Sequence, residues 1–227
     1  SQLRVNNYEV IIIDADPLRL DDPAVLSMIR EEKYSAVVAT VSLPTLHNDC
    51  AFIAQLQGLT DRVIVKTMIR DDAILREVLK RSGADFVIHG ECDMHIHELL
   101  DGTSRAGTAF MKDGELVVED VKPVEDMDKL PLPSWDLLPL DKYTYPLLGQ
   151  GVITMQTSRG CPFPCSYYCP YPLVEGNVWR GQSPERVVRE IEELVTKYGV
   201  RKILFRAFQK FCFFQQIIKF FQKSNII

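Results

Sequence analysis

The chain has 227 residues, which is enough for one large domain or two small ones. Hydrophobic residues make up 46% and charged residues 25%, a balance that excludes a disordered, collagen-like or coiled-coil chain. The net charge of −5 gives no general reason to expect a nucleic-acid partner. No apolar run approaches the ~18–20 residues of a membrane span, and the first residues lack the pattern of a signal peptide. We therefore expect a cytoplasmic protein without a membrane or nucleic-acid partner.

The first hundred residues alternate between short β-rich runs and amphipathic helical patterns. Strands are predicted at residues 8–13, 36–41, 62–66 and 84–89. Helices are predicted at residues 22–32 and 71–81, and two more end near Gln57 and Leu100. Alternation at this spacing predicts a parallel sheet with helices on both faces.

The pattern changes after residue 105. Residues 108–118 predict a β-hairpin that turns at Asp113-Gly114, and a proline-spaced linker follows to residue 150. A second unit then begins, with strands at 152–157 and 202–205 on either side of a helix that Ser183 caps and Gly199 ends. We expect three parts: an α/β domain (1–105), a hairpin and linker (106–150), and a second domain (151–227).

Three of the six cysteines, Cys161, Cys165 and Cys169, fall within nine residues. Interspersed prolines exclude a regular helix, so the segment must be a loop wrapped around something. Three thiolates suit an iron–sulfur cluster with one iron left open for a substrate. They also suit zinc with a fourth ligand, and since all four histidines lie upstream, that ligand would be Cys212 or a distant His. The zinc alternative would make the chain a binding module without catalysis.

The segment 158–172, SRGCPFPCSYYCPYP, with the capped helix and strand that follow, resembles the opening of a radical S-adenosylmethionine enzyme. The resemblance implies a partial (β/α) barrel, of which this chain holds the first β-α-β. It implies that Cys161, Cys165 and Cys169 bind a [4Fe–4S] cluster whose open iron holds S-adenosylmethionine, with Tyr168 near the adenine. A reductant such as flavodoxin or ferredoxin would supply the electron that cleaves S-adenosylmethionine to a radical.

One spacing departs from that family. Its members usually have CxxxCxxC, whereas this chain has CxxxCxxxC, as if Tyr167 or Tyr168 were an extra residue. An inserted residue rotates the third thiolate unless the loop bulges.

The segment 130–143, LPLPSWDLLPLDKY, resembles the linker of the cobalamin-binding subgroup of these enzymes. The resemblance implies that the first domain is an incomplete doubly wound, flavodoxin-like sheet. Four residues at the carboxyl ends of its strands would line the cobalamin face: Ser42, Pro44, Gly90 and Glu91. Members of the subgroup often transfer a methyl group to an unactivated carbon of a small molecule, so we expect a transferase whose substrate the sequence does not identify.

Two short segments of the first domain differ from motifs of cobalamin-binding proteins. The subgroup often has Gly-Gly after the third strand, where this chain has Lys66-Thr67. Asp93-Met94-His95 follows a different strand from the motif that places a histidine on cobalt, so we expect no protein ligand to the metal. Cys92, His95 and His97 are either polar residues of a surface helix or a separate metal site.

The resemblance covers residues 1–206. In the family a first strand precedes the equivalent of residue 1, and a barrel needs about 200 residues or more, so we expect a fragment with little or no turnover. Residues 201–227 carry six basic side chains and no acidic one. Residues 207–227 are interpreted as an aberrant end, a helix over 208–223 without special function, or a helix for nucleic acid or a membrane surface.

Overall fold

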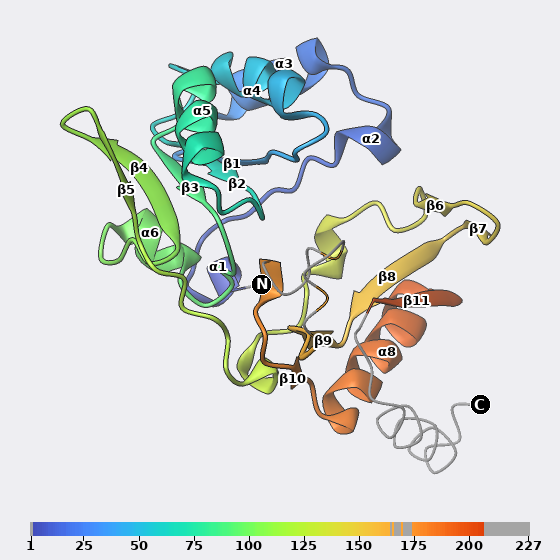
Figure 1. Ribbon diagram of the computed structural model, residues 1–227. Helices are drawn as coiled ribbons and strands as arrows, with labels where there is room; N and C mark the ends of the chain where they lie inside the picture. Colours follow the sequence, from blue (N-terminus) through green and yellow to red (C-terminus); the bar gives the residue numbers. More distant parts are fainter. Residues whose placement is uncertain (1, 164, 166–168, 170–173, 207–227) are drawn as a thin grey trace. The chain divides into compact units, whose positions relative to one another are not determined.

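The computed structural model describes residues 2–163, 165, 169 and 174–206. It divides into two compact units (Figure 1). We call Leu20–Val124 the sheet unit. The other, the Cys-loop unit, comprises the described residues up to Arg19 and from Glu125 onward. The expected domain ranges stay predictions, and the compact units group the chain differently at residues 1–19 and 106–124.

The sheet unit contains a mixed five-stranded sheet in a fully described part of the chain, with strand order β1-β2-β3-β4-β5. Its strands are β1 (Val37–Thr40), β2 (Val63–Lys66), β3 (Phe86–Ile88), β4 (Thr108–Lys112) and β5 (Glu115–Val118). The first three are parallel, β4 pairs antiparallel with β3, and β5 pairs antiparallel with β4. The predicted hairpin at Asp113-Gly114 is confirmed, with positive φ at both residues. The parallel sheet is confirmed for β1, β2 and β3, but the hairpin extends it, so the whole sheet is mixed.

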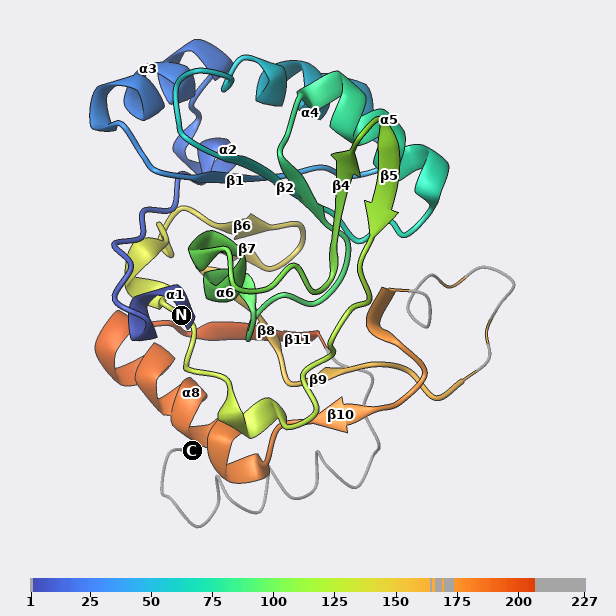
Figure 2. The ribbon, with the colours of Figure 1, turned by 90° about the vertical axis from the view of Figure 1, so that its left-hand side faces the viewer.

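Helices cover both faces of this sheet, as the sequence predicts. They are α3 (Asp22–Glu32), α4 (Leu46–Ala54), α5 (Asp72–Ser82) and α6 (Ile96–Asp101). The first three lie on one face and α6 on the other (Figure 2). Leu99 of α6 packs against Ile64 and Ile88 of the sheet. Asp71 begins α5 by accepting a hydrogen bond from the Ile74 amide, and Gly83 ends it with φ 68°.

The predicted strand at residues 8–13 does not form. This segment lies between two short helices, α1 (Gln2–Val5) and α2 (Ala15–Leu18), and groups with the Cys-loop unit. Ile11 and Ile12 are 52% and 42% exposed. The segment joins none of the sheets of the described residues, so its β-rich composition alone does not make it a strand.

The Cys-loop unit contains the predicted β-α-β. Strand β8 (Val152–Gln156) pairs in parallel with β11 (Lys202–Arg206), and α8 (Pro184–Tyr198) connects them. Ser183 caps α8 by accepting from the Arg186 amide. Buried apolar side chains of α8 and the strands form two clusters. One contains Met155, Val187 and Ile191, and the other contains Trp135, Ile153, Leu194 and Val200. The barrel itself remains a prediction.

The linker is ordered, as expected. It forms two 3₁₀ turns, η1 (Met127–Lys129) and η2 (Trp135–Leu137), and a small hairpin of β6 (Thr144–Tyr145) and β7 (Gly149–Gln150). The buried Arg186 side chain donates to the carbonyl oxygens of Asp128 and Pro131 at 3.3 and 3.2 Å. The α8 helix therefore holds the linker by both apolar packing and hydrogen bonds. Across the described part of the chain, every helix is too short or too polar to cross a membrane.

Candidate functional site

The Cys loop (residues 160–176) follows β8 and is closed at its base. Short strands β9 (Ser158–Arg159) and β10 (Arg180–Gly181) pair antiparallel on either side of it. The Gln182 amide donates to the Thr157 carbonyl at 2.9 Å, and the Cys161 amide donates to the Gly176 carbonyl at 3.0 Å. The two ends of the loop are thus held together immediately beside the first cysteine.

Glu175 joins both sides of this base. One carboxylate oxygen accepts from the Gly160 amide and the other from the Gln156 side chain, each at 3.1 Å. The Glu175 carbonyl accepts from Arg180 at 2.8 Å. Glu175 was not predicted as a site residue. It lies fourteen residues after the first cysteine, and nothing in the sequence around it indicates which groups it binds.

Gly160 is required at the entrance of the loop for two reasons. Its φ of 76° lies in the left-handed region, which side chains disfavour. A Cβ at this position would also overlap the carbonyl oxygen of Val178. The glycine before Cys161 therefore permits the close approach of the two loop ends.

The three cysteines differ in exposure. Cys161 is 2% exposed, whereas Cys165 and Cys169 are partly exposed, and all three are free thiols. The Cys169 amide donates to the Cys165 carbonyl at 3.4 Å. Within the described residues, no three His, Cys, Asp or Glu side chains form a group that could hold a metal ion. The structure thus brings the cysteines onto one closed loop without gathering their thiols.

The donor set of the loop fits an iron–sulfur cluster with one open iron. It offers three thiols from one loop, the donors that such clusters use. Tyr168, the expected neighbour of the adenine, and Cys212, the fourth ligand of the zinc alternative, lie outside the described residues.

Two of the four residues expected at the cobalamin face are exposed to solvent. Ser42 and Pro44 are exposed in the turn after β1. The Ser42 amide donates to the Asp49 carboxylate at 3.1 Å, and the Ser42 hydroxyl lies 2.7 Å from the hydroxyl of Thr45. Thr45 also donates to Asp49, at 2.6 Å. This network orders the start of α4.

The other two expected residues, Gly90 and Glu91, are buried after β3. The Gly90 backbone is covered by Val121, whose methyl groups fill the place that a Cβ would take. The Glu91 carboxylate accepts from the Val124 amide at 3.0 Å. The carboxyl ends of parallel strands lie at one edge of the sheet, so the four residues share that edge, with β2 between β1 and β3. Of the four, only Ser42 and Pro44 are exposed to solvent.

His89 is a buried histidine at the same edge. Its Nε2 donates to the Glu119 carbonyl at 3.1 Å, and its Nδ1 has no hydrogen-bond partner. Burial chiefly lowers the pKa of His89, and the nearby charges of Arg70 and Lys66 lower it further, against the hydrogen bond to Glu119. The buried edge therefore disfavours the charged form of this imidazole.

The second metal site considered in the sequence does not form among the described side chains. Cys92, His95 and His97 do not gather into a group that could hold a metal ion. The His95 imidazole, at the N-cap of α6, instead lies 3.2 Å from the Glu98 carboxylate of that helix. Cys92 packs against the apolar cluster of Ile64, Ile88 and Leu99, so the other interpretation, polar residues of a surface helix, does not describe it.

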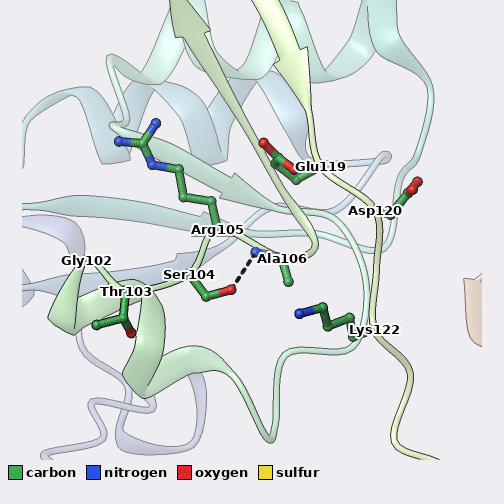
Figure 3. A pocket seen from close by; sticks show the side chains of 8 residues that line it. All are labelled: Gly102, Thr103, Ser104, Arg105, Ala106, Glu119, Asp120 and Lys122. Atoms are coloured by element: carbon green, nitrogen blue, oxygen red, sulfur yellow. Dashed lines mark hydrogen bonds between the residues drawn. The ribbon is translucent and has the colours of Figure 1, made fainter.

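A hollow of about 420 Å³ lies elsewhere on the sheet unit, between the end of α6 and the end of β5 (Figure 3). It is lined by Gly102, Thr103, Ser104, Arg105, Ala106, Glu119, Asp120 and Lys122. The charges of its two basic and two acidic side chains cancel. The Arg105 guanidinium stacks on Phe86 and Phe110, at 5.6 and 4.6 Å from the ring centres. The hollow therefore has no concentrated charge of one sign.

The chain is similar to methyltransferases and cyclases. It is 38% identical over 129 residues to an uncharacterized methyltransferase of Pyrococcus horikoshii, an alignment that covers 53% of this chain and 28% of the relative. It is 27% identical over 213 residues to the anaerobic magnesium-protoporphyrin IX monomethyl ester cyclase of Rubrivivax gelatinosus, covering 87% and 38%. An uncharacterized methyltransferase of Synechocystis is 30% identical over 127 residues, covering 56% and 21%.

The chain thus spans between about a fifth and two fifths of the length of these curated relatives. No protein-family model matches it.

Proposed function

Since the chain belongs to the radical S-adenosylmethionine proteins that carry a cobalamin-binding domain, we propose that its Cys loop is a cluster-binding site. Cys161, Cys165 and Cys169 would be the three protein ligands of a [4Fe–4S] cluster, with S-adenosylmethionine at the fourth iron. The bound cluster would supply one electron for reductive cleavage of S-adenosylmethionine, taken from a reductant such as flavodoxin or ferredoxin.

One observation carries this proposal: the Cys loop is closed at its base directly after the first strand of a β-α-β. Thr157, Gly160 and Cys161 are all hydrogen-bonded to the far end of the loop. Residues of this chain therefore position the loop at the carboxyl end of β8, where ligands bind in parallel α/β folds. The backbone contacts hold the loop, and the thiols are left to bind the metal.

The proposal extends to the sheet unit. Ser42 and Pro44 would contact the face of a cobalamin, with Gly90 and Glu91 buried at the same sheet edge. Tyr168 would lie near the adenine of S-adenosylmethionine. Bound cobalamin would supply a methyl group for transfer to an unactivated carbon of a small-molecule substrate. The two relatives named as methyltransferases support this reaction class. For the chain by itself we expect little or no turnover.

A zinc-stabilised binding module is the competing function, and anaerobic reconstitution with iron and sulfide separates the two. The proposal predicts about four irons per chain and an EPR spectrum after dithionite that changes when S-adenosylmethionine is added. Cys161→Ala should lose this iron, and Cys212→Ala should retain it. Stoichiometric zinc that iron does not replace, with equal destabilisation by both variants, would overturn the proposal.

A further inference from the structure

Lys66 spans the carboxyl edge of the sheet unit. It is the last residue of β2, and its ammonium group donates a short hydrogen bond to the carbonyl oxygen of Gly90, which follows β3. The same ammonium lies 3.4 Å from the Thr67 carbonyl and 3.2 Å from the Met68 sulfur. A lysine ammonium has three donors, and these contacts direct the head group across the edge rather than out into solvent.

The far end of this bridge is fixed. The His89 amide donates to the Gly107 carbonyl at 3.0 Å, which attaches the residue before Gly90 to the start of β4. Val121 packs on one side of Gly90, and the Arg70 guanidinium lies beside it, 3.3 Å from the place of a Cβ. The Gly90 carbonyl is therefore a fixed acceptor for the Lys66 ammonium group.

We propose that Lys66 is a gate residue, whose side chain must leave the Gly90 carbonyl before a ligand can lie against the carboxyl edge between β1 and β3. Ligands of open parallel sheets bind outside this edge. The turn after β1, with Ser42 and Pro44, is exposed, so the edge is open at β1 and bridged between β2 and β3. This inference rests on the cobalamin part of the proposed function.

The hydrogen bond from Lys66 to the Gly90 carbonyl opposes ligand binding at this edge. A ligand that needs the Gly90 backbone must break a hydrogen bond from a charged donor, and such bonds are stronger than neutral ones. This cost reduces the affinity of the edge for its ligand, and it disappears when Lys66 is shortened.

Hydroxocobalamin binding to the full chain tests the gate, by equilibrium dialysis and by visible spectra after desalting. Lys66→Ala removes the donor and the stem, and Lys66→Met keeps a long stem without the donor. Lys80→Ala, on an exposed position of α5, is the matched control. We expect Lys66→Ala to bind about tenfold more tightly than the natural chain, a change of about 1.4 kcal/mol. Lys66→Met should lie between them, and the control should match the natural chain.

Hydrogen exchange of the amides at residues 66–68 and 89–91 supplies a readout that does not depend on the ligand. Exchange there should rise in Lys66→Ala and stay unchanged in Lys80→Ala. Equal affinity of Lys66→Ala and the natural chain would overturn the gate and leave cobalamin binding intact. Weaker binding by Lys66→Ala would make Lys66 a ligand contact and also overturn the gate. If neither the natural chain nor any variant retained hydroxocobalamin, both the gate and the cobalamin proposal would be overturned. The iron measurement would remain an independent test of the Cys loop.

Discussion

The Glu175 carboxylate accepts a hydrogen bond from the Gly160 amide at 3.1 Å, so an acid near the end of the Cys loop anchors the residue before its first cysteine. The other oxygen of the same carboxylate is bound to Gln156, at the end of β8. A single side chain thus connects the strand, the entrance and the exit of the loop.

Removing Glu175 should loosen the loop. We expect Glu175→Ala to lower the free energy of unfolding by about 2 kcal/mol, because hydrogen bonds to a charged acceptor and a buried donor are lost. The iron retained after reconstitution should fall with it. Glu175→Gln keeps an acceptor oxygen and should recover part of both losses. Asn177→Ala, an exposed change in the neighbouring turn, should alter neither quantity in urea unfolding or iron assays.

Gly160 and Gly176 provide a matched pair of glycines. Both have positive φ, but a Cβ overlaps the Val178 carbonyl only at Gly160, and nothing lies within 4 Å of one at Gly176. We expect Gly160→Ala to cost more than about 2 kcal/mol of unfolding free energy. Gly176→Ala should cost about 1 kcal/mol, from backbone strain alone. Equal costs in denaturant unfolding would show that the close approach is not a constraint.

Glu190 should make stability depend on pH. It is 2% exposed within α8, and burial raises its pKa to about 7, although Arg186 beside it opposes this and Glu193 adds to it. Between about pH 4.5 and 7 the folded chain keeps a proton that the unfolded chain has released. Stability therefore falls as the pH rises through this range and levels off above it.

Glu190→Gln should remove this pH dependence and raise the free energy of unfolding at pH 7 and above. A shift from 4.5 to about 7 corresponds to about 3 kcal/mol at most. Thermal unfolding at pH 5, 6, 7 and 8 measures the effect. Glu192→Gln on the same helix should leave the pH profile unchanged. A natural chain whose stability rises from pH 5 to 7 relative to Glu190→Gln would contradict the assignment.

Tyr143 attaches the linker to the N-terminal segment of the same unit. Its hydroxyl donates to the Asp14 carboxylate at 2.6 Å, and burial and this hydrogen bond both raise the pKa of Tyr143. Tyr143→Phe should cost about 1–2 kcal/mol of unfolding free energy. Tyr145→Phe, at an exposed position of β6, is the control and should be neutral. A spectroscopic titration of the natural chain against Tyr143→Phe should show that Tyr143 ionises above the usual pH range of tyrosine.

Local signals in the sequence predicted most helices and strands. Asp22-Pro23 predicted the start of a helix that runs to about Glu32, and α3 spans Asp22–Glu32, because capping depends on neighbouring residues alone. The cap itself is Asp21, one residue before the predicted Asp22. Residues 8–13 have the composition of a buried strand, but strand formation also requires a neighbour to pair with. The hairpin was predicted correctly, and its addition to the sheet was not, since the pairing of β4 with β3 joins segments about 20 residues apart.

The candidate site was predictable only as a set of cysteines. Their spacing and prolines indicated a ligand-binding loop, which is local information. The contacts that close the loop, such as that of Cys161 with Gly176, and the bridge of Lys66 to Gly90 depend on how the chain returns on itself. No periodicity or short motif carries that information.

The closed base of the Cys loop has a consequence for how metal is captured. Most of the entropy needed to bring the ends of a loop together is lost before any ligand arrives, because backbone hydrogen bonds already join Cys161 to Gly176. Once one thiolate has bound an iron, the others meet it at a high effective concentration rather than by search through free chain configurations. The folded base thereby turns three separate monodentate donors into a single chelating ligand.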